Sequence, residues 1–281
     1  MKNLGYYNGK IGIIEQMKIP MTDRAFYFGD GVYDAVMCRN NIPYLLFEHI
    51  ERLYKNCERL SINVPITETE LYSLICDLVK KVDGNEKFVY FHISRGSALR
   101  SHSSMPKKGN ICVMITPQSV GDINAKMKAK LVEDNRYNYC DIKTLNLLPS
   151  VLAAQSADAD GCDEAIFHRK GIVTEGSHCN VSIISNNKII TAPANCHILP
   201  GVTRAHLIKE AGKMGVLVEE REYSTEELKG ADEVLITSSS KLLRGVETIN
   251  GEKVGGKNSL LLKALQNKLL SNYFEATKID F

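Results

Sequence analysis

The hydrophobic pattern of the 281-residue chain changes at residues 118–127, QSVGDINAKM, and this change limits how the chain can fold. Before it, strand-like runs at 87–96 and 110–117 accompany amphipathic helical segments at 47–60 and 68–82. After it, short strand-like runs alternate with helical ones. A turn-rich stretch between two patterns is typical of a domain linker. We therefore expect an α+β protein with domains at 1–119 and 124–281 joined by a linker at 120–123.

Two local signals refine the first domain. Asn8-Gly9 lies between strand-like residues, which predicts a hairpin. The turn Gly29–Gly31 leads into a strand in which Tyr33 and Val32 point to opposite faces. In the second domain the pattern predicts strands at 129–134, 164–176, 180–192 and 231–240, and helices at 151–161, 202–215 and 259–274.

Composition excludes several classes of protein. The net charge is +2 with dispersed Lys and Arg, so we expect neither nucleic acid nor anionic lipid as a partner. No apolar run approaches the roughly 18 residues of a membrane span, and the start MKNLGYYNGK lacks a signal-peptide pattern, which predicts a cytoplasmic protein. Eight cysteines without a C-x-x-C pair, and scattered histidines, predict buried thiols and no bound metal.

One lysine stands out in CDIKTLNLLPS, residues 140–150. Lys143 lies between an apolar segment and a run of small apolar residues, where burying an ammonium is costly. It either extends its charged tip to water, as most such lysines do, or it is buried so that its lowered pKa frees a neutral amine to attack a carbonyl.

Four further positions have both an ordinary and a chemical interpretation. The amides of Val202 and Thr203 start a helix after Pro200-Gly201, where they either belong to an ordinary capped helix or bind an anion. The run Thr237–Ser240 is a polar turn or a set of phosphate donors. Glu175 is a solvated turn residue or a carboxylate that holds a proton on a ring nitrogen. Arg100 and His102 are a solvated loop pair or a carboxylate trap.

Together, a phosphate cup, a carboxylate and a reactive lysine describe a pyridoxal phosphate site. The chain resembles the fold-type-IV pyridoxal-phosphate aminotransferases, and among them the bacterial D-amino acid aminotransferases. The similarity covers nearly the whole length. It is carried by DRAFYFGDGVYDAV, EHIERLY, RGSALRSH, CDIKTLNLL, VTEGSHCNV, LPGVTR and ITSSS.

The resemblance implies a small N-terminal α/β domain, a larger barrel-like C-terminal domain, a homodimer and pyridoxal 5′-phosphate as cofactor. It implies transamination between a D-amino acid, such as D-alanine or D-glutamate, and a 2-oxo acid such as 2-oxoglutarate. It makes Lys143 the Schiff-base lysine and Glu175 the partner of the pyridine nitrogen. Its implied phosphate binders are Arg52, Val202, Thr203, Ser238 and Ser239; Leu199 packs on the ring, and Tyr33, Arg100 and His102, with His49 nearby, take the substrate carboxylate.

Three alternatives belong to the same analysis. They are a branched-chain L-amino acid aminotransferase, a lyase of the aminodeoxychorismate type, and a cofactor-binding protein without turnover. The pair Arg100 and His102 favours the D-amino acid enzyme. The chain departs from the family pattern at His178-Cys179, where small hydroxyl residues are usual, and at Pro200, and both departures bear on substrate range.

Overall fold

The structure is a computed structural model that describes residues 1–279. The chain divides into two compact units. The first unit comprises residues 1–119, residues 142–146 and the residues from Tyr273 on, and the second comprises residues 120–141 and 147–272. The short segment around Lys143 therefore belongs to the first unit, although second-unit residues precede and follow it in sequence. Val120 and Ile123, in the predicted linker, are buried.

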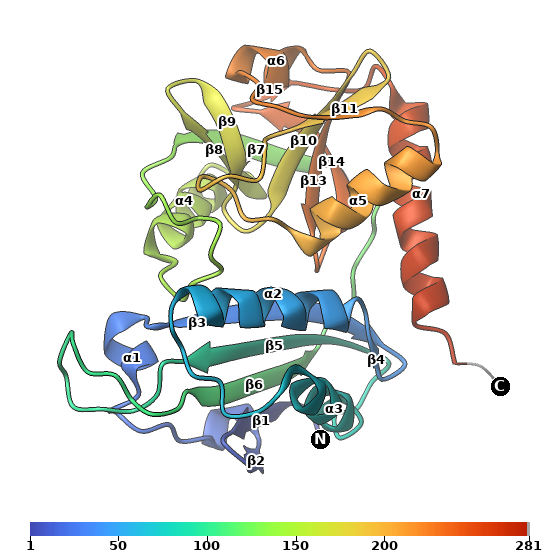
Figure 1. Cartoon of the computed structure of the whole chain (residues 1–281). Coiled ribbons are helices and arrows are strands. Elements are labelled where there is room, and N and C mark those ends of the chain that lie inside the picture. The colour runs from blue at the N-terminus through green and yellow to red at the C-terminus, as the bar shows by residue number, and fades with distance from the viewer. Residues whose placement is uncertain (280–281) are drawn as a thin grey trace. The chain divides into compact units, whose positions relative to one another are not determined.

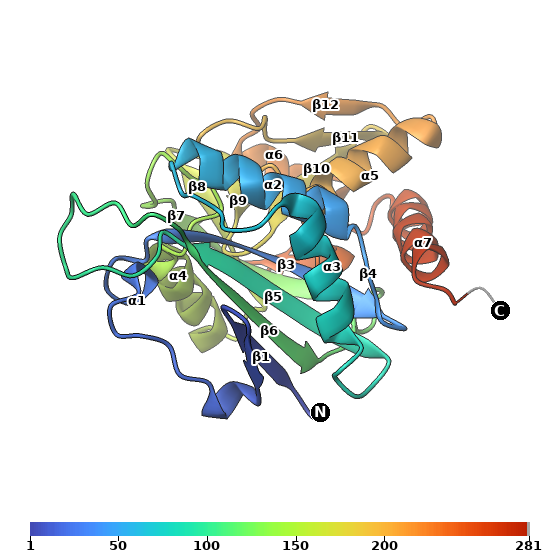
Figure 2. The ribbon, with the colours of Figure 1, turned by 60° about the horizontal axis from the view of Figure 1, so that its bottom comes forward.

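The first unit is an antiparallel sheet covered by two helices on one face (Figures 1 and 2). The sheet order is β2-β1-β6-β5-β3-β4. Its elements are β1 (Leu4–Tyr7), β2 (Lys10–Gly12), the 3-10 helix η1 (Ile14–Gln16), α1 (Arg24–Phe28), β3 (Gly31–Arg39), β4 (Ile42–Pro43), α2 (Leu46–Arg59), α3 (Glu68–Val79), β5 (Glu86–Ser94) and β6 (Asn110–Pro117).

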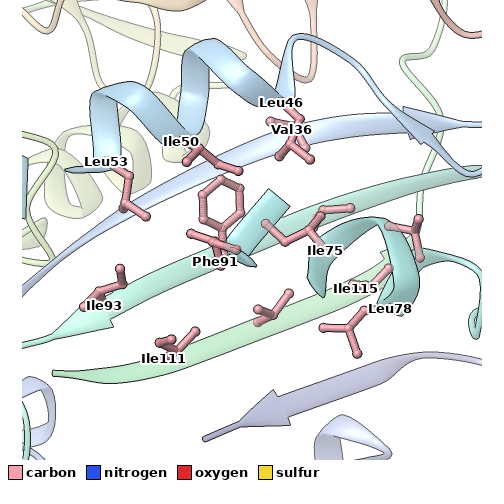
Figure 3. Close-up of a cluster of buried hydrophobic side chains, with 14 of the residues drawn as sticks. Val36, Leu46, Ile50, Leu53, Ile75, Leu78, Phe91, Ile93, Ile111 and Ile115 are labelled. Carbon is pink, nitrogen blue, oxygen red and sulfur yellow. The ribbon is translucent and has the colours of Figure 1, made fainter. Parts of the chain in front are cut away.

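The core of the first unit lies between this sheet and helices α2 and α3. Figure 3 shows Ile50 of α2 and Ile75 of α3 directed towards Phe91 of β5, and all three side chains are at most 1% exposed. A capping box starts α3, because the hydroxyl of Thr67 accepts a bond from the amide of Glu70 while the Glu70 carboxylate accepts the amide of Thr67. In α2, the apolar face that the sequence predicts is the face that is buried against the sheet.

The second unit is built on a nine-stranded mixed sheet in the order β12-β11-β10-β13-β14-β7-β8-β9, with β15 paired to β14. Its elements are β7 (Met127–Glu133), α4 (Leu148–Ala159), β8 (Glu164–Arg169), β9 (Ile172–Gly176), β10 (Asn180–Ser185), β11 (Lys188–Thr191), α5 (Val202–Lys213), β12 (Val218–Glu220), α6 (Thr225–Gly230), β13 (Glu233–Ser238), β14 (Leu242–Ile249), β15 (Glu252–Lys253) and α7 (Ser259–Ala276), whose last residues belong to the first unit. The sheet curls so that β9 approaches β10 (Figure 1).

Two-residue turns set the register of five hairpins. Both central residues have positive φ, as type I′ turns require, at Asn8-Gly9, Asn40-Asn41, Lys170-Gly171, Asn186-Asn187 and Asn250-Gly251. Asn and Gly supply nine of these ten residues, since they tolerate this conformation best. The predicted hairpin at Asn8-Gly9 is confirmed, and the predicted strands 164–176 and 180–192 are each a hairpin rather than one strand.

Most predicted elements are present, and their mixture of helices and sheets confirms the α+β class. Strand β6 has the predicted bounds, and α2 differs from them by one residue at each end. The sequence pattern does not predict β14, because Arg244, Gly245 and Glu247 interrupt its apolar alternation. No helix in residues 1–279 combines the length and apolar character needed to cross a membrane.

The first-unit core generates a stability prediction. Phe91→Ala should lower the free energy of unfolding by about 3–5 kcal/mol, because it removes a buried ring and leaves a cavity. Guanidinium unfolding followed by fluorescence measures this change. Leu260→Ala is the control, because this side chain is 85% exposed and its loss should change stability by less than about 0.5 kcal/mol. Equal effects of the two substitutions would contradict the assigned core.

Candidate active site

Lys143 is held by backbone pairing to the start of β3. The amide of Tyr33 donates to the carbonyl of Lys143 at 2.9 Å, and the amide of Leu145 donates to the carbonyl of Gly31 at 3.0 Å. Ile142 anchors the segment in the first-unit core. The Lys143 ammonium lies 4.3 Å from the centroid of the Tyr33 ring. The structure thus brings together the predicted lysine and the predicted tyrosine.

An aromatic stack continues from Tyr33 along the sheet. The rings of Tyr33 and Tyr90 stack with centroids 5.5 Å apart, and the Tyr90 ring meets the His92 ring edge-on at 5.6 Å. Burial lowers the pKa of His92 to about 4, so its imidazole is neutral near pH 7. The surface beneath Lys143 is therefore aromatic and, at His92, uncharged.

Asp34 organises the inner face of α2. Its carboxylate accepts two bonds from Arg52, from Nε at 2.9 Å and from Nη2 at 2.8 Å, and it contacts Nδ1 of His49 at 2.7 Å. Burial opposes its ionisation, but the Arg52 guanidinium and His49 hold the pKa of Asp34 well below its usual range. Burial also lowers the pKa of His49, so this ring contacts Asp34 as a neutral hydrogen-bond donor.

Arg100 and His102 lie on the loop between β5 and β6, and both are exposed. The Arg100 guanidinium carbon is 5.0 Å from the centroid of the Phe28 ring, and the His102 ring centroid is 4.9 Å from the same ring. The two predicted carboxylate-binding side chains therefore share one aromatic neighbour at the end of α1. Their polar groups are accessible to a solute.

Glu175 of β9 is a buried carboxylate of the second unit that is held by several donors. It is only 5% exposed. Its Oε1 accepts a bond from Arg136 Nη1 at 2.6 Å, and its Oε2 accepts bonds from the Leu199 amide at 2.9 Å and Asn180 Nδ2 at 3.0 Å. Three donors, one of them the Arg136 guanidinium, stabilise the ionised form. Leu199 contacts Glu175 through its backbone, and this contact is additional to the apolar role that the resemblance implies.

Arg136 is held in place in turn by Asp134. Nε and Nη2 of Arg136 each donate to the Asp134 carboxylate at 2.9 Å, and Arg169 adds a bond at 3.1 Å. Although burial opposes ionisation, the bonds from Arg136 bring the pKa of Asp134 to about 2. The sequence analysis missed Arg136, Asp134 and Asn180. The available signal was their polarity at the ends of apolar strands, where a buried polar group needs a partner.

The start of α5 packs tightly against Asn180. A Cβ on Gly201 would lie 2.0 Å from Oδ1 of Asn180, so only glycine fits this position. Gly201 is the N-cap and no side chain caps the helix, which leaves the amides of Val202 and Thr203 suited to an anion. Asn180 thereby links the helix start to Glu175.

The end of β13 lies beside the same asparagine. Thr237 is directly opposite Asn180 in the antiparallel pair, so both side chains point to one face. The hydroxyl of Thr237 is buried, and within residues 1–279 it has no hydrogen-bond partner. Ser238 and Ser239 follow in the turn to β14. The hydroxyls of Ser238 and Ser239 and the amides of Val202 and Thr203 are all hydrogen-bond donors, and none of these groups is a carboxylate. Such a set fits the oxygens of a phosphate group.

The predicted phosphate binders fall in both units. Arg52 belongs to the first unit, where it binds Asp34, whereas Val202, Thr203, Ser238 and Ser239 belong to the second. Lys143 and Tyr33 belong to the first unit, and Glu175 and Leu199 to the second. Across the described residues, no group of three or more His, Cys, Asp or Glu side chains has the arrangement of a metal site.

The fold, the lysine and tyrosine of the first unit, and the buried carboxylate and helix amides of the second unit together define a protein of the aminotransferase class. Residues 31–249 match the family described as amino-transferase class IV, and the chain belongs to that family. It is 34% identical over 280 residues to the D-alanine aminotransferase of Bacillus licheniformis, covering 94% of this chain and 96% of that protein. It is 33% identical over 266 residues to the Staphylococcus haemolyticus protein of the same name, covering 93% and 94%.

The fold is similarly well matched. The branched-chain amino acid aminotransferase of Escherichia coli superposes with a TM-score of 0.88, covering 100% of this chain and 98% of that one, at 21% identity. At this identity the likeness shows the fold alone. The predicted fold and the predicted class of enzyme are thus both confirmed.

The buried pair of Asp134 and Arg136 predicts a pH dependence of stability. Because the folded pKa of Asp134 is about 2 and the unfolded value is about 3.9, its contribution is complete above the unfolded pKa and is lost as pH falls towards 2. Between pH 5 and pH 3 about 1 kcal/mol should be lost. The difference in unfolding free energy between wild type and Asp134→Asn should narrow by this amount.

Urea unfolding at several pH values between 5 and 3 measures this narrowing. Asp77→Asn serves as the control, since Asp77 is an exposed helix residue paired with Lys80. A wild-type to Asp134→Asn difference that is constant over this pH range would contradict the assigned ion pair.

Proposed function

We propose that the protein is a pyridoxal 5′-phosphate-dependent aminotransferase that moves the amino group between a D-amino acid and a 2-oxo acid. The structural observation that carries this proposal is Glu175, a buried carboxylate held ionised by Arg136, Asn180 and the Leu199 amide. The choice of the D-series is supported by identities of 33–34% to proteins named D-alanine aminotransferase.

The proposed chemistry assigns a distinct task to each group. When bound, the cofactor supplies a pyridinium ring that accepts the electrons released as a Cα–H bond breaks. Lys143 attaches the cofactor and moves the proton between the substrate Cα and the cofactor C4′. Glu175 holds a proton on the ring nitrogen, and Leu199 packs against the ring.

The remaining groups bind the phosphate of the cofactor and the carboxylate of the substrate. The proposed phosphate binders are the amides of Val202 and Thr203, the hydroxyls of Ser238 and Ser239, and the guanidinium of Arg52. Tyr33, Arg100 and His102, with His49 nearby, are the proposed carboxylate binders. An arginine and a histidine on one exposed loop suit a substrate carboxylate.

We further propose a cytoplasmic homodimer with a small domain at 1–119 and a larger one at 124–281. All eight cysteines are free thiols, as is usual in a reducing compartment. Leu148, Val151 and Leu152 of α4 are 67%, 45% and 55% exposed, and an exposed apolar surface of this kind favours a partner subunit. The expected reactants are small amino acids and 2-oxo acids.

Glu175→Gln tests the ring-nitrogen role. The neutral amide cannot keep that nitrogen protonated, so kcat should fall on the order of 100-fold or more while the cofactor stays bound. Keto-acid release measures turnover, and absorbance after alkaline release measures cofactor content. Glu219→Gln is the matched control, because this carboxylate belongs to the same unit and pairs with Lys188 on the surface. Near wild-type turnover in Glu175→Gln would exclude the role.

Arg100→Ala tests the stereochemical assignment. If Arg100 and His102 hold the carboxylate, only one enantiomer directs its Cα hydrogen towards Lys143, so D-alanine should react far faster than L-leucine. Removing the charge-assisted contact should cost about 1.5–3 kcal/mol, or roughly 10- to 150-fold in kcat/KM for D-alanine. Cofactor content should not change.

The neighbouring exposed Lys107→Ala is the control for charge on this loop. A faster reaction with L-leucine than with D-alanine, together with unchanged activity of the Arg100→Ala variant, would contradict this assignment. That outcome would favour the branched-chain L-amino acid enzyme, whose fold the chain shares.

A further inference from the structure

Two turns lie at the same end of neighbouring strands in the second unit. The turn 176–179 joins β9 to β10, and the turn 239–241 joins β13 to β14. Asn180 and Thr237, the residues next to these turns, are paired across the antiparallel strands. The second turn carries Ser239 and follows Ser238, the two hydroxyls assigned to phosphate binding under the proposed function.

Lys241 connects the two turns. Its ammonium lies 2.9 Å from Nε2 of His178 and 3.2 Å from Oε2 of Glu164. Nδ1 of His178 lies 3.2 Å from the same carboxylate and 3.0 Å from the hydroxyl of Ser177. Because Nε2 faces an ammonium, it must be the accepting nitrogen, and the proton of a neutral ring is then on Nδ1.

Glu164 is the buried centre of this cluster. Its carboxylate also accepts bonds from the amide and the hydroxyl of Ser177, and the side chain is completely buried. Burial opposes ionisation, but His178, Lys241 and Ser177 together keep the pKa of Glu164 below its usual range. The charges of Glu164 and Lys241 cancel, so the ion pair presents no net negative charge to an anion.

The second turn also needs an anchor for its shape. Leu242, directly after Lys241, has φ +52°, a left-handed conformation that is strained for a residue with a side chain. The Lys241 amide donates to the Ser238 hydroxyl at 3.2 Å, which closes the turn. The bonds from the Lys241 ammonium to Glu164 and His178 fix this turn relative to its neighbour.

We propose that Lys241 is a positioning residue that, through Glu164 and His178, makes the site selective for the phosphorylated form of its cofactor. The inference rests on the proposed function. Lys241 acts in two ways: it holds the turn that follows Ser238 and carries Ser239, and it neutralises Glu164 next to these proposed phosphate binders. Without Lys241 the buried carboxylate would repel the phosphate. Pyridoxal, which lacks the phosphate, would experience no such repulsion.

Lys241→Met tests this inference, because methionine keeps the length of the side chain and removes its charge. The equilibrium affinities of the cofactor-free enzyme for pyridoxal 5′-phosphate and for pyridoxal are measured by fluorescence titration. The expected result is a loss of at least tenfold for the phosphorylated form and less than twofold for pyridoxal. Lys188→Met is the matched control, since Lys188 makes a 2.9 Å ion pair with Glu219 in the same unit.

Unchanged affinity for the phosphorylated form, or equal losses for both ligands, would overturn the inference, because a purely structural defect is not selective. If Lys241→Met does not fold, His178→Ala decides in the same way: a selective loss of at least threefold supports the inference, and no selective loss refutes it. Wild-type enzyme that binds neither ligand would refute the proposed function itself. Wild-type binding without selective loss in the variants would refute the inference alone.

Discussion

Ion pairs between a buried carboxylate and a cation shape three of the candidate functional regions. Asp34 is paired with Arg52, Glu175 with Arg136, and Glu164 with Lys241. Removing one partner of such a pair typically costs roughly 3–5 kcal/mol, because the other charge stays buried. The geometry of these groups is therefore tied to the stability of the fold. A carboxylate that is fixed in this way keeps its charge, which is what a group facing a protonated ring nitrogen must do.

Tight turns bring these charges together. Glu164 begins β8 and Glu175 lies near the end of β9, and the turn Lys170-Gly171 sets the register between their strands. A shift of one residue in register would turn each side chain to the opposite face of its strand and separate it from its cation. By setting the strand register, the positive φ angles of these turn residues therefore help to place Glu164 and Glu175 beside their cations. In a similar way, the close packing of Gly201 against Asn180 fixes the position of the start of α5.

Local patterns predicted the regular elements well, and they predicted charge partners poorly. The period of α2 and the alternation of β6 are visible within a few residues, so these elements were predicted nearly to the residue. Arg136 is 39 residues from Glu175, and nothing near either residue indicates the other. The Lys143 segment pairs with β3 over a still larger separation, since Tyr33 and Lys143 are 110 residues apart, and the segment therefore belongs to the first unit although its neighbours in sequence belong to the second. Asn40-Asn41 and Asn186-Asn187 are weaker turn signals than Asn8-Gly9.

The departure from the family pattern at His178-Cys179 has a physical explanation in the second unit. A hydroxyl residue at position 178 is too short to reach across to the other turn, whereas the imidazole of His178 accepts a bond from Lys241 and still contacts Glu164. The sulfur of Cys179 packs against Gly176, where an added Cβ would lie 2.2 Å from it, so a side chain at position 176 would clash with Cys179. His178 and Lys241 therefore form one structural feature, in which the position of each side chain depends on the other.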